Sequence, residues 1–369
     1  MLCGLILTLV KNANKSYNCY GDYMNFSLIP KSAPENNIRG GKYEWADVNN
    51  SPFSVHGVFY SEKDGFLRIE KDTAGEISGG VKMLCNNTAG GRVRFKTDSP
   101  FIAVSVTQEN NILLPHIPLC SQSGLDLYGD GKYIGTFMPK MNIKSGFCAV
   151  INTSGEMVDY TINMPLYDNV KKMYISLSPN ANVEKSDDYR IKSPIAFYGS
   201  SITQGASASR PGNCYTARTS QNLNADYINL GFAANCHGEK KMAEYIGNLS
   251  ISALVLDYDH NCKDEQELKE NHYTFYKTVR EKNSLVPIVI MSAPDILNNK
   301  EKFFLRREII KTTYETAKAE GDNNVYFLDG EQLFAGDASD TCTVDGIHPN
   351  DFGFYRISCV LTELLNKIL

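Results

Sequence analysis

The hydrophobic pattern of this 369-residue chain changes its period part way along, and that change constrains the fold more than any other feature. Before residue 180, short β-like runs alternate with turn signals, which is typical of a β-sandwich. After residue 193, apolar runs alternate with helix-length segments, which is typical of a parallel sheet covered by helices on both faces. The polar stretch 180–193 between them predicts a domain boundary.

The N-terminal half is expected to form a jelly-roll-like β-sandwich over residues 45–185, after an N-terminal extension of residues 1–44. Asp130-Gly131 stands between two β-like runs and is a strong hairpin signal. Met24 is a second candidate start for the chain, ahead of the sandwich. The runs expected as strands are 91–97, 101–107, 125–128 and 133–137.

The C-terminal half is expected to form a three-layer α/β/α domain with a parallel sheet over residues 190–369. The expected strands are 194–198, 227–230, 253–256, 287–291 and 325–328. The expected helices are 213–223, 239–249, 264–282, 301–319 and 352–368. In open sheets of this kind, ligands bind beyond the carboxyl ends of the strands. The residues that follow each strand are therefore the candidates for a functional site.

A Ser-His-Asp set for ester hydrolysis stands at these positions. Ser201 follows the first expected strand, and a serine hydroxyl becomes a good nucleophile when a base takes its proton. Asp345 and His348 lie three residues apart in one loop, so the carboxylate can reach one imidazole nitrogen and leave the other free. Ser201, His348 and Asp345 are therefore candidates for a nucleophile, a base and an orienting carboxylate. Because residue 203 is Thr, the Gly-x-Ser-x-Gly elbow of α/β-hydrolases is not supported.

Three groups from successive strand ends are candidate donors to an oxyanion: the backbone N–H of Ser201, the backbone N–H of Gly231 and the side-chain amide of Asn261. Such donors stabilise the tetrahedral intermediate of acyl transfer. Two simpler interpretations stay open. Gly231 is an ordinary turn glycine in one of them, and Asn261 caps the following helix in the other.

Three further residues are candidates for the substrate pocket. Asp259 and His260 precede Asn261, and we favour a structural role in which they fix the loop that presents it. His116 lies in a loop of the sandwich and either packs locally, which we favour, or reaches the site across the domain interface. A metal site built from His237, His260 and Asp259 lacks a helical histidine spacing, so we expect no metal and no organic cofactor.

The linker 180–193 is short and lacks the Gly/Ser-rich or Pro-rich composition of a flexible tether. We therefore predict a fixed interface between the two halves, with the loop 114–123 near the mouth of the site. Binding sites often form at such junctions.

Four blocks resemble the SGNH (GDSL-like) hydrolase superfamily, in the family's order: Gly199-Ser200-Ser201-Ile202, Gly231, Asn261 and Asp345-x-x-His348. The resemblance implies a serine esterase with the Ser201, His348 and Asp345 roles given above, in which Gly231 and Asn261 complete the oxyanion hole. The chain departs from the pattern at three positions. Ser200 stands where the Gly-Asp-Ser-Leu signature has Asp, and Asp259 and Cys262 replace the Gly and Asp of the third block.

The N-terminal half carries a second resemblance. The stretches 87–95 and Gly124-Leu125-Asp126-Leu127-Tyr128 are similar to a β-sandwich domain with a Gly-x-Asp-Leu-Tyr motif. That domain precedes a GDSL-like branch of bacterial hydrolases. The two resemblances together cover most of the chain after residue 45.

The expected activity is hydrolysis of short acyl esters, acetyl groups on a carbohydrate above all, through an acyl-enzyme. The alternatives are a lipid or aryl esterase, a thioesterase, and a non-catalytic glycan-binding protein. The expected partner is a small-molecule or oligosaccharide ester. A net charge of −5 without a long basic run excludes a nucleic-acid partner.

We expect no membrane partner either, because the apolar run Leu2–Val10 is far too short to span a bilayer. The ten cysteines contain no Cys-x-x-Cys pair and fit free thiols in a reducing compartment. We therefore expect a cytoplasmic location, although the sequence leaves secretion open.

Overall fold

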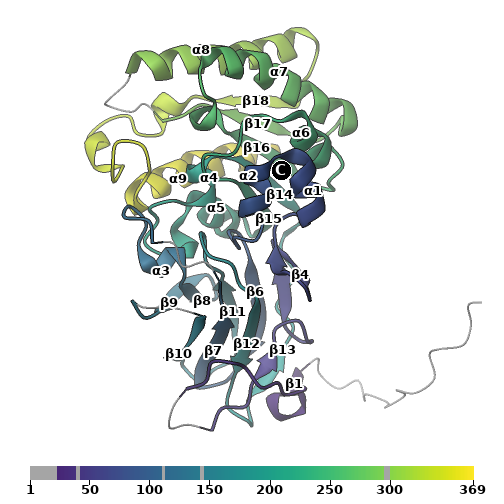
Figure 1. Cartoon of the computed structure of the whole chain (residues 1–369), viewed down its shortest axis with the longest axis vertical. Coiled ribbons are helices and arrows are strands. Elements are labelled where there is room, and N and C mark those ends of the chain that lie inside the picture. Colours follow the sequence, from purple (N-terminus) through teal and green to yellow (C-terminus); the bar gives the residue numbers. More distant parts are fainter. Residues whose placement is uncertain (1–22, 39–41, 110–112, 142–144, 295–299) are drawn as a thin grey trace, which may run out of the picture.

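The computed structural model describes residues 23–38, 42–109, 113–141, 145–294 and 300–369. Two antiparallel sheets form the lower part of the molecule in Figure 1, and a parallel sheet with helices on both faces forms the upper part. We call these parts the β-rich region and the α/β region. The mixed fold that the two hydrophobic patterns predicted is confirmed.

The β-rich region contains a seven-stranded and a four-stranded antiparallel sheet. The first holds, in order, β1 (Tyr23–Asn25), β13 (Asn182–Glu184), β6 (Arg92–Thr97), β11 (Val158–Asn163), β8 (Leu125–Gly129) and β9 (Lys132–Phe137), with β3 (Ser54–His56) also paired to β6. The second holds β10 (Gly146–Asn152), β7 (Phe101–Thr107), β12 (Lys172–Ser176) and β2 (Ala46–Asp47).

One core joins the two antiparallel sheets. Leu125 and Leu127 reach it from β8, and Val104 and Ile175 reach it from β7 and β12. The predicted hairpin is present, because Asp130 and Gly131 turn the chain from β8 into β9 with φ of 46° and 73°. Positive φ at both central turn residues matches the twist of the flanking strands.

The N-terminal extension expected for residues 1–44 is wrong for the part that the structure describes. Strand β1 pairs with β13 at the edge of the seven-stranded sheet, and Phe26 and Ile29 are buried in the core between the sheets. Burial of these two side chains holds the segment in place. Residues 1–22 lie outside the described part of the chain.

A helical pair that the pattern did not predict interrupts the β-rich half. Helices α1 (Lys71–Ile77) and α2 (Gly79–Leu84) follow the small hairpin of β4 (Phe59–Ser61) and β5 (Gly65–Leu67). The pair lies beside the α/β region in Figure 1. Its buried residues Ala74 and Val81 join the core of that region. Two helices at residues 71–84 therefore interrupt the segment 45–185, which was expected as a β-sandwich.

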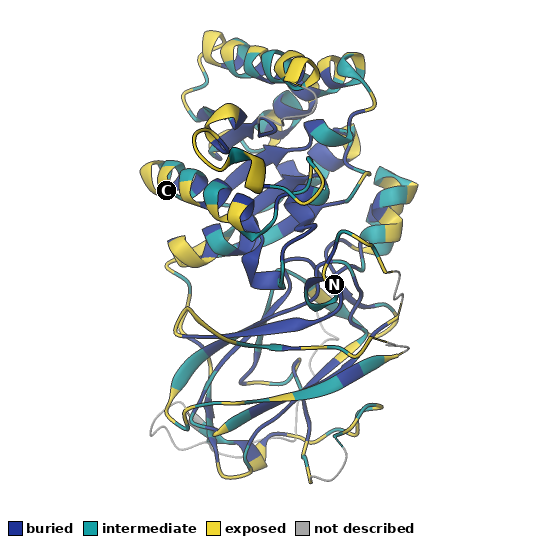
Figure 2. Cartoon of the chain, turned by 90° about the vertical axis from the view of Figure 1, so that its left-hand side faces the viewer, coloured by how far each residue is buried: buried dark blue, intermediate teal, exposed yellow. Residues whose placement is uncertain are grey.

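The α/β region is built on five parallel strands in the order β15, β14, β16, β17, β18. Their bounds are Ala225–Gly231, Ile191–Gly199, Ala253–Asp257, Ile288–Met291 and Val325–Leu328. Figure 2 shows this sheet as a buried layer. The five expected strands are confirmed, and each begins or ends within a few residues of its predicted bounds.

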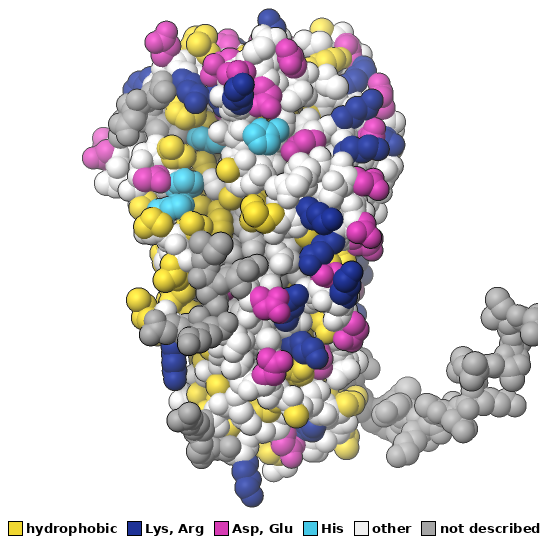
Figure 3. Space-filling model, viewed as in Figure 1, with side chains coloured by type: hydrophobic (Ala, Val, Ile, Leu, Met, Phe, Trp, Pro, Cys, Tyr) yellow, Lys and Arg dark blue, Asp and Glu magenta, His cyan; other side chains and the backbone are white. Residues whose placement is uncertain are grey.

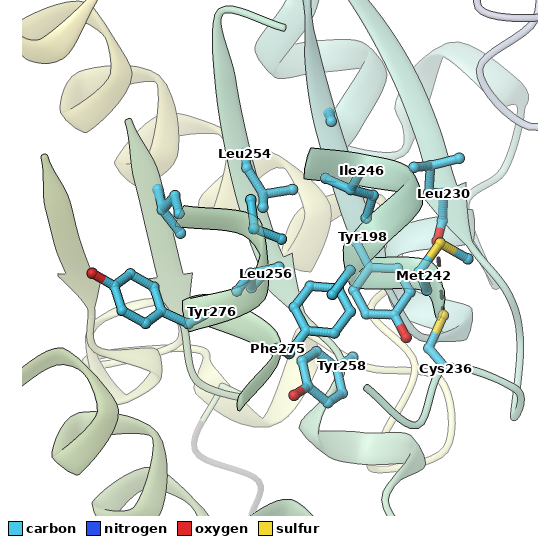
Figure 4. Close-up of a cluster of buried hydrophobic side chains, with 14 of the residues drawn as sticks. Tyr198, Leu230, Cys236, Met242, Ile246, Leu254, Leu256, Tyr258, Phe275 and Tyr276 are labelled. Carbon is cyan, nitrogen blue, oxygen red and sulfur yellow. Dashed lines mark hydrogen bonds between the residues drawn. The ribbon is translucent and has the colours of Figure 1, made fainter. Parts of the chain in front are cut away.

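Helices cover both faces of the parallel sheet. On one face Tyr198, Leu254 and Leu256 meet α6 (Lys240–Gly247), α7 (Glu265–Lys282) and α8 (Lys300–Ala319), and Figure 4 shows part of this cluster. On the other face Phe197 and Val255 meet α5 (Tyr215–Leu223) and α9 (Asp351–Ile368). Successive residues of one strand point to opposite faces, so strands buried on both faces are apolar throughout.

Among the described helices, none combines the length and the apolarity that crossing a bilayer requires. The eight cysteines in the described part of the chain are free thiols.

Candidate active site

Ser201 stands where β14 ends, as the first residue of the short helix α4 (Ser201–Gln204). Ser200 caps this helix, and its Oγ accepts a hydrogen bond from the Ile202 N–H at 3.1 Å. Within the described residues, no group accepts a hydrogen bond from the Ser201 backbone N–H. The first N–H groups of a helix lack partners inside it, so this N–H is free to bind an anion.

The turn before Ser201 requires a glycine. A Cβ at Gly199 would lie 2.1 Å from the backbone oxygen of Asp257, which is too close for any side chain. The Ser200 N–H donates to that same oxygen at 3.1 Å. The Gly-Ser-Ser sequence thus lets the chain turn tightly after β14 against the end of β16. The turn leaves the Ser201 hydroxyl at the edge of the parallel sheet.

His348 and Asp345 complete a hydrogen-bonded relay from Ser201. The Ser201 Oγ lies 2.9 Å from His348 Nε2, and His348 Nδ1 lies 2.8 Å from Asp345 Oδ2. Asp345 Oδ1 also accepts the backbone N–H groups of Ile347 at 3.0 Å and His348 at 2.8 Å. Partial burial alone would raise the pKa of Asp345, but the hydrogen bonds from His348 and Ile347 lower it to about 2. The carboxylate is therefore ionised at neutral pH and fixes the imidazole.

Asn261 ends a short 3-10 turn, η3 (Asp259–Asn261), beyond β16. Its side-chain amide donates to the backbone oxygen of Phe232 at 3.2 Å, so it lies beside the segment that follows β15. It does not cap α7, because Asp264 does so by accepting the Glu267 N–H at 2.9 Å. The interpretation of Asn261 as a helix cap is therefore wrong.

Gly231 does not offer the donor that the sequence predicted. Its N–H donates to Asn229 Oδ1 at 2.9 Å, and the residue is buried. A Cβ at this position would lie 2.3 Å from the Gln204 backbone nitrogen, so the glycine allows β15 to pack against α4. The prediction of Gly231 as an oxyanion donor is corrected on this ground: its N–H is already paired inside the protein.

His116 reaches the site from the β-rich region, and the interpretation of local packing is wrong. Its ring centroid lies 4.7 Å from that of His348, with 31° between the ring planes. The Ser207 hydroxyl donates to the His116 backbone oxygen at 2.8 Å and holds this part of the loop. Burial lowers the pKa of His116, and the nearby His348 acts in the same direction. His116, in the loop 114–123, thus lies beside His348. Histidines stand next to hydrophobic side chains on this face (Figure 3).

Asp259 and His260 lie next to the site in supporting positions. Asp259 Oδ2 accepts the Ala293 N–H at 3.1 Å, and its backbone oxygen accepts a hydrogen bond from the buried Arg306. These bonds tie the loop to the end of β17. The ring centroids of His260 and Phe303 lie 5.3 Å apart. Burial lowers the pKa of His260.

His237 Nδ1 lies 3.6 Å from Glu267 Oε1. Within the described residues, no three His, Cys, Asp or Glu side chains group as a metal site would require.

Sequence reasoning missed a buried carboxyl below the nucleophile turn. Asp257 Oδ2 accepts hydrogen bonds from Thr203 Oγ1 at 2.9 Å and from the Tyr215 hydroxyl at 3.0 Å. Burial, together with the charge of Asp259, raises the pKa of Asp257 to about 8, so this carboxyl is mostly protonated at pH 7. The aspartate closes an otherwise apolar strand, a signal that was visible in the sequence.

The geometry and the comparisons with known proteins define an ester hydrolase. Residues 192–366 match the model of the GDSL-like lipase/acylhydrolase family, and residues 43–183 match the N-terminal GxDLY domain of SGNH-hydrolase-type esterases. A putative GDSL-like lipase from Bacteroides ovatus ATCC 8483 is 30% identical, with a TM-score of 0.81 over 89% of this chain and 98% of that one. The chain belongs to the GDSL-like lipase/acylhydrolase family.

Two more distant structures share the fold. The salicylyl-acyltransferase SsfX3 from a tetracycline biosynthetic pathway is 20% identical, with a TM-score of 0.73 over 89% of this chain and 98% of that one. An acetyl xylan esterase from the rumen bacterium Butyrivibrio proteoclasticus is 13% identical, with a TM-score of 0.58 over the same shares. A search of curated proteins finds no match.

Proposed function

We propose that this ester hydrolase removes short acyl groups, acetyl above all, from carbohydrates by means of Ser201, His348 and Asp345. The relay of 2.9 Å from Ser201 Oγ to His348 Nε2 and 2.8 Å from His348 Nδ1 to Asp345 Oδ2 is the observation that carries the proposal. In this geometry His348 is within reach of the Ser201 proton, and Asp345 stabilises the imidazolium that forms.

In the first half of the proposed reaction, Ser201 Oγ attacks the ester carbonyl while His348 Nε2 takes its proton. The oxyanion that forms is bound by the Ser201 N–H and the Asn261 amide. His348 then returns the proton to the departing alcohol oxygen, and an acyl-enzyme remains. In the second half His348 activates a water molecule, which releases the acid and restores the Ser201 hydroxyl.

We infer that the backbone N–H of Ala234, in the loop after β15, is a third oxyanion donor in place of the Gly231 N–H. Ala234 adopts φ of 57°, a conformation that side-chain-bearing residues seldom take. Its two neighbours are engaged: the Ala233 N–H donates to Gln204 Oε1 and the Asn235 N–H to the Phe232 oxygen. Within the described residues the Ala234 N–H has no acceptor, and the same loop holds the Asn261 amide. Backbone strain of this kind occurs at functional sites.

The carbohydrate part of the proposal is supported by the proteins that share this fold. They include an acetyl xylan esterase and a family two carbohydrate esterase from Clostridium thermocellum solved with cellohexaose. His116 also supports it, because an imidazole beside His348 offers both a flat ring and a polar edge to a sugar.

The nucleophile is tested with the Ser201→Ala variant and p-nitrophenyl acetate. We expect kcat to fall by about 10⁴ or more, the scale for loss of a serine nucleophile, with the fold retained. Mass loss of acetyl groups from acetylated oligosaccharides then tests the substrate class. Activity of the variant within tenfold of wild type would show that Ser201 is not the nucleophile. Turnover of aryl or long-chain esters alone would contradict the carbohydrate assignment.

A further inference from the structure

The Gly-x-Asp-Leu-Tyr motif, residues 124–128, has no part in the proposed chemistry, yet it places a carboxyl in an enclosed position. Leu125 and Leu127 point into the core between the antiparallel sheets. Side chains of a strand alternate, so Asp126 and Tyr128 point to the opposite face, toward the α/β region. Asp126 is fully buried. A buried carboxyl is costly unless its oxygens are hydrogen-bonded.

Asp126 joins the two regions of the molecule. Its Oδ1 accepts a hydrogen bond from Asn163 Nδ2 at 2.8 Å, within the seven-stranded sheet. Its Oδ2 accepts the backbone N–H of Gly212 at 2.8 Å, in the short turn η2 (Pro211–Asn213) between α4 and α5. Arg210 Nε lies 3.7 Å from the same oxygen and brings a positive charge near it.

Tyr128 holds the same backbone by contact. A Cβ at Gly212 would lie 2.5 Å from the Tyr128 ring, so only glycine lets the turn approach the tyrosine this closely. The aspartate and the tyrosine of the motif therefore fix one peptide of the α/β region from two sides.

The short turn η2, which Asp126 holds, is also hydrogen-bonded to the start of α9. Asp351 Oδ2 accepts from Asn213 Nδ2 at 2.7 Å and from the Ser209 hydroxyl at 2.5 Å, and Asp351 Oδ1 accepts the Ser209 N–H at 2.8 Å. Asp351 is the first residue of α9 and follows His348 by three residues. Each step from Asp126 to the His348 loop is thus one hydrogen bond or a few covalent bonds.

We propose that Asp126 is a positioning residue, which fixes the His348 loop against Ser201 through Gly212, Asn213 and Asp351. The proposal rests on the proposed function, because it assigns the motif to the support of the same relay. A positioning role requires that Asp126 act on the rate of the chemical step. Substrate binding should change little, since Asp126 is enclosed and touches no substrate.

The test exchanges the hydrogen-bonding partners in the sheet. In Asp126→Asn an amide N–H₂ faces either Asn163 Nδ2 or the Gly212 N–H, so one acceptor is lost. In the double variant Asp126→Asn/Asn163→Asp, the 126 amide oxygen accepts from Gly212 and its N–H₂ donates to the 163 carboxylate. We expect kcat for p-nitrophenyl acetate to fall about tenfold or more in each single variant, with KM within about twofold, and to recover in the double variant.

A matched control lies directly opposite Asp126 in the sheet. Thr136 pairs in register with Asp126, and its hydroxyl bonds to the Tyr133 hydroxyl at 2.8 Å. Thr136→Val should therefore leave kcat within about twofold of wild type. Ser201→Ala, assayed in parallel, reports on the proposed function separately: an active Ser201→Ala enzyme would invalidate the relay itself.

Three results would overturn the positioning role. The first is a folded Asp126→Asn variant with wild-type kcat, and the second is a folded double variant that does not recover kcat. The third is a double variant that fails to fold although its side chains are able to form both hydrogen bonds. If Asp126→Asn itself does not fold, the double variant decides the question.

Discussion

At the residue scale, the candidate site shows one carboxylate doing two tasks. Asp345 orients His348 through its ring and, through two backbone N–H groups, also shapes the loop that carries the ring. The three-residue spacing of Asp345 and His348 allows both tasks, because one oxygen serves the turn and the other serves the imidazole. The three-residue spacing, which is visible in the sequence, is therefore the local feature that this geometry requires.

The Asn261 amide can be tested apart from the nucleophile. We expect Asn261→Ala to lower kcat by roughly 10²–10³, the scale for one preorganised oxyanion donor, because the charge it stabilises develops only in the transition state. KM should change little. Steady-state kinetics on p-nitrophenyl acetate give both constants. A rise in KM at constant kcat would assign Asn261 to binding of the ground-state substrate instead.

At the scale of elements, α7 and α8 are joined by a buried histidine. His272 on α7 lies 2.8 Å, through Nδ1, from the Thr313 hydroxyl on α8 and stacks on Tyr258. Burial lowers the pKa of His272 to about 3, so the ring stays neutral in the folded protein well below the usual titration range. This contact joins two long helices that also share one hydrophobic core on the same face of the sheet.

The buried ring predicts the pH dependence of stability. The unfolded chain protonates His272 below a pKa of about 6.5, whereas the folded chain does so only near pH 3, so acidification between these values favours unfolding. We expect His272→Gln to lose less stability than wild type between pH 7 and pH 4, by up to about 1.4 kcal/mol per pH unit. Urea unfolding of both proteins at each pH measures the free energy of unfolding and its change with pH.

Thr274→Ala is the control for this comparison, because it removes an exposed side chain of the same helix that does not titrate. It should follow the wild-type slope. Equal slopes for wild type and His272→Gln would contradict the assignment of a neutral buried ring.

At the scale of the whole molecule, the two regions are not independent. The helical pair α1–α2 comes from the β-rich half of the sequence but buries Ala74 and Val81 in the α/β core, and His116 crosses to the ring of His348. Asp126 of the β-rich region also accepts a hydrogen bond from the Gly212 backbone N–H of the α/β region. The β-rich region thus forms part of the support and part of the wall of the candidate site.

We therefore expect the fragment 190–369 to be poorly soluble or inactive, even on p-nitrophenyl acetate. It lacks the side chains that cover the α6 face, and exposed apolar patches of that kind promote association. Expression, size-exclusion chromatography and the esterase assay on fragment and full chain measure the effect. A soluble fragment with full activity would show that the β-rich region contributes nothing to the site.

Local patterns in the sequence were enough to predict the regular elements of the fold. Strand and helix periods along 194–368 predicted the five strands of the parallel sheet, and the resemblance of four sequence blocks to the SGNH superfamily pointed to Ser201, Asp345 and His348. The structure brings these three side chains into one hydrogen-bonded relay. Periodicity encodes which face of each element is apolar, and this pattern is visible over a dozen neighbouring residues.

Tertiary structure alone decided the contacts between distant segments. The N–H of Gly231 is taken by Asn229, His116 lies against a ring more than 200 positions away, and residues 71–84 cover a sheet formed much later in the chain. No local pattern records such contacts, because each depends on packing and hydrogen bonding between segments that become neighbours only when the chain has folded.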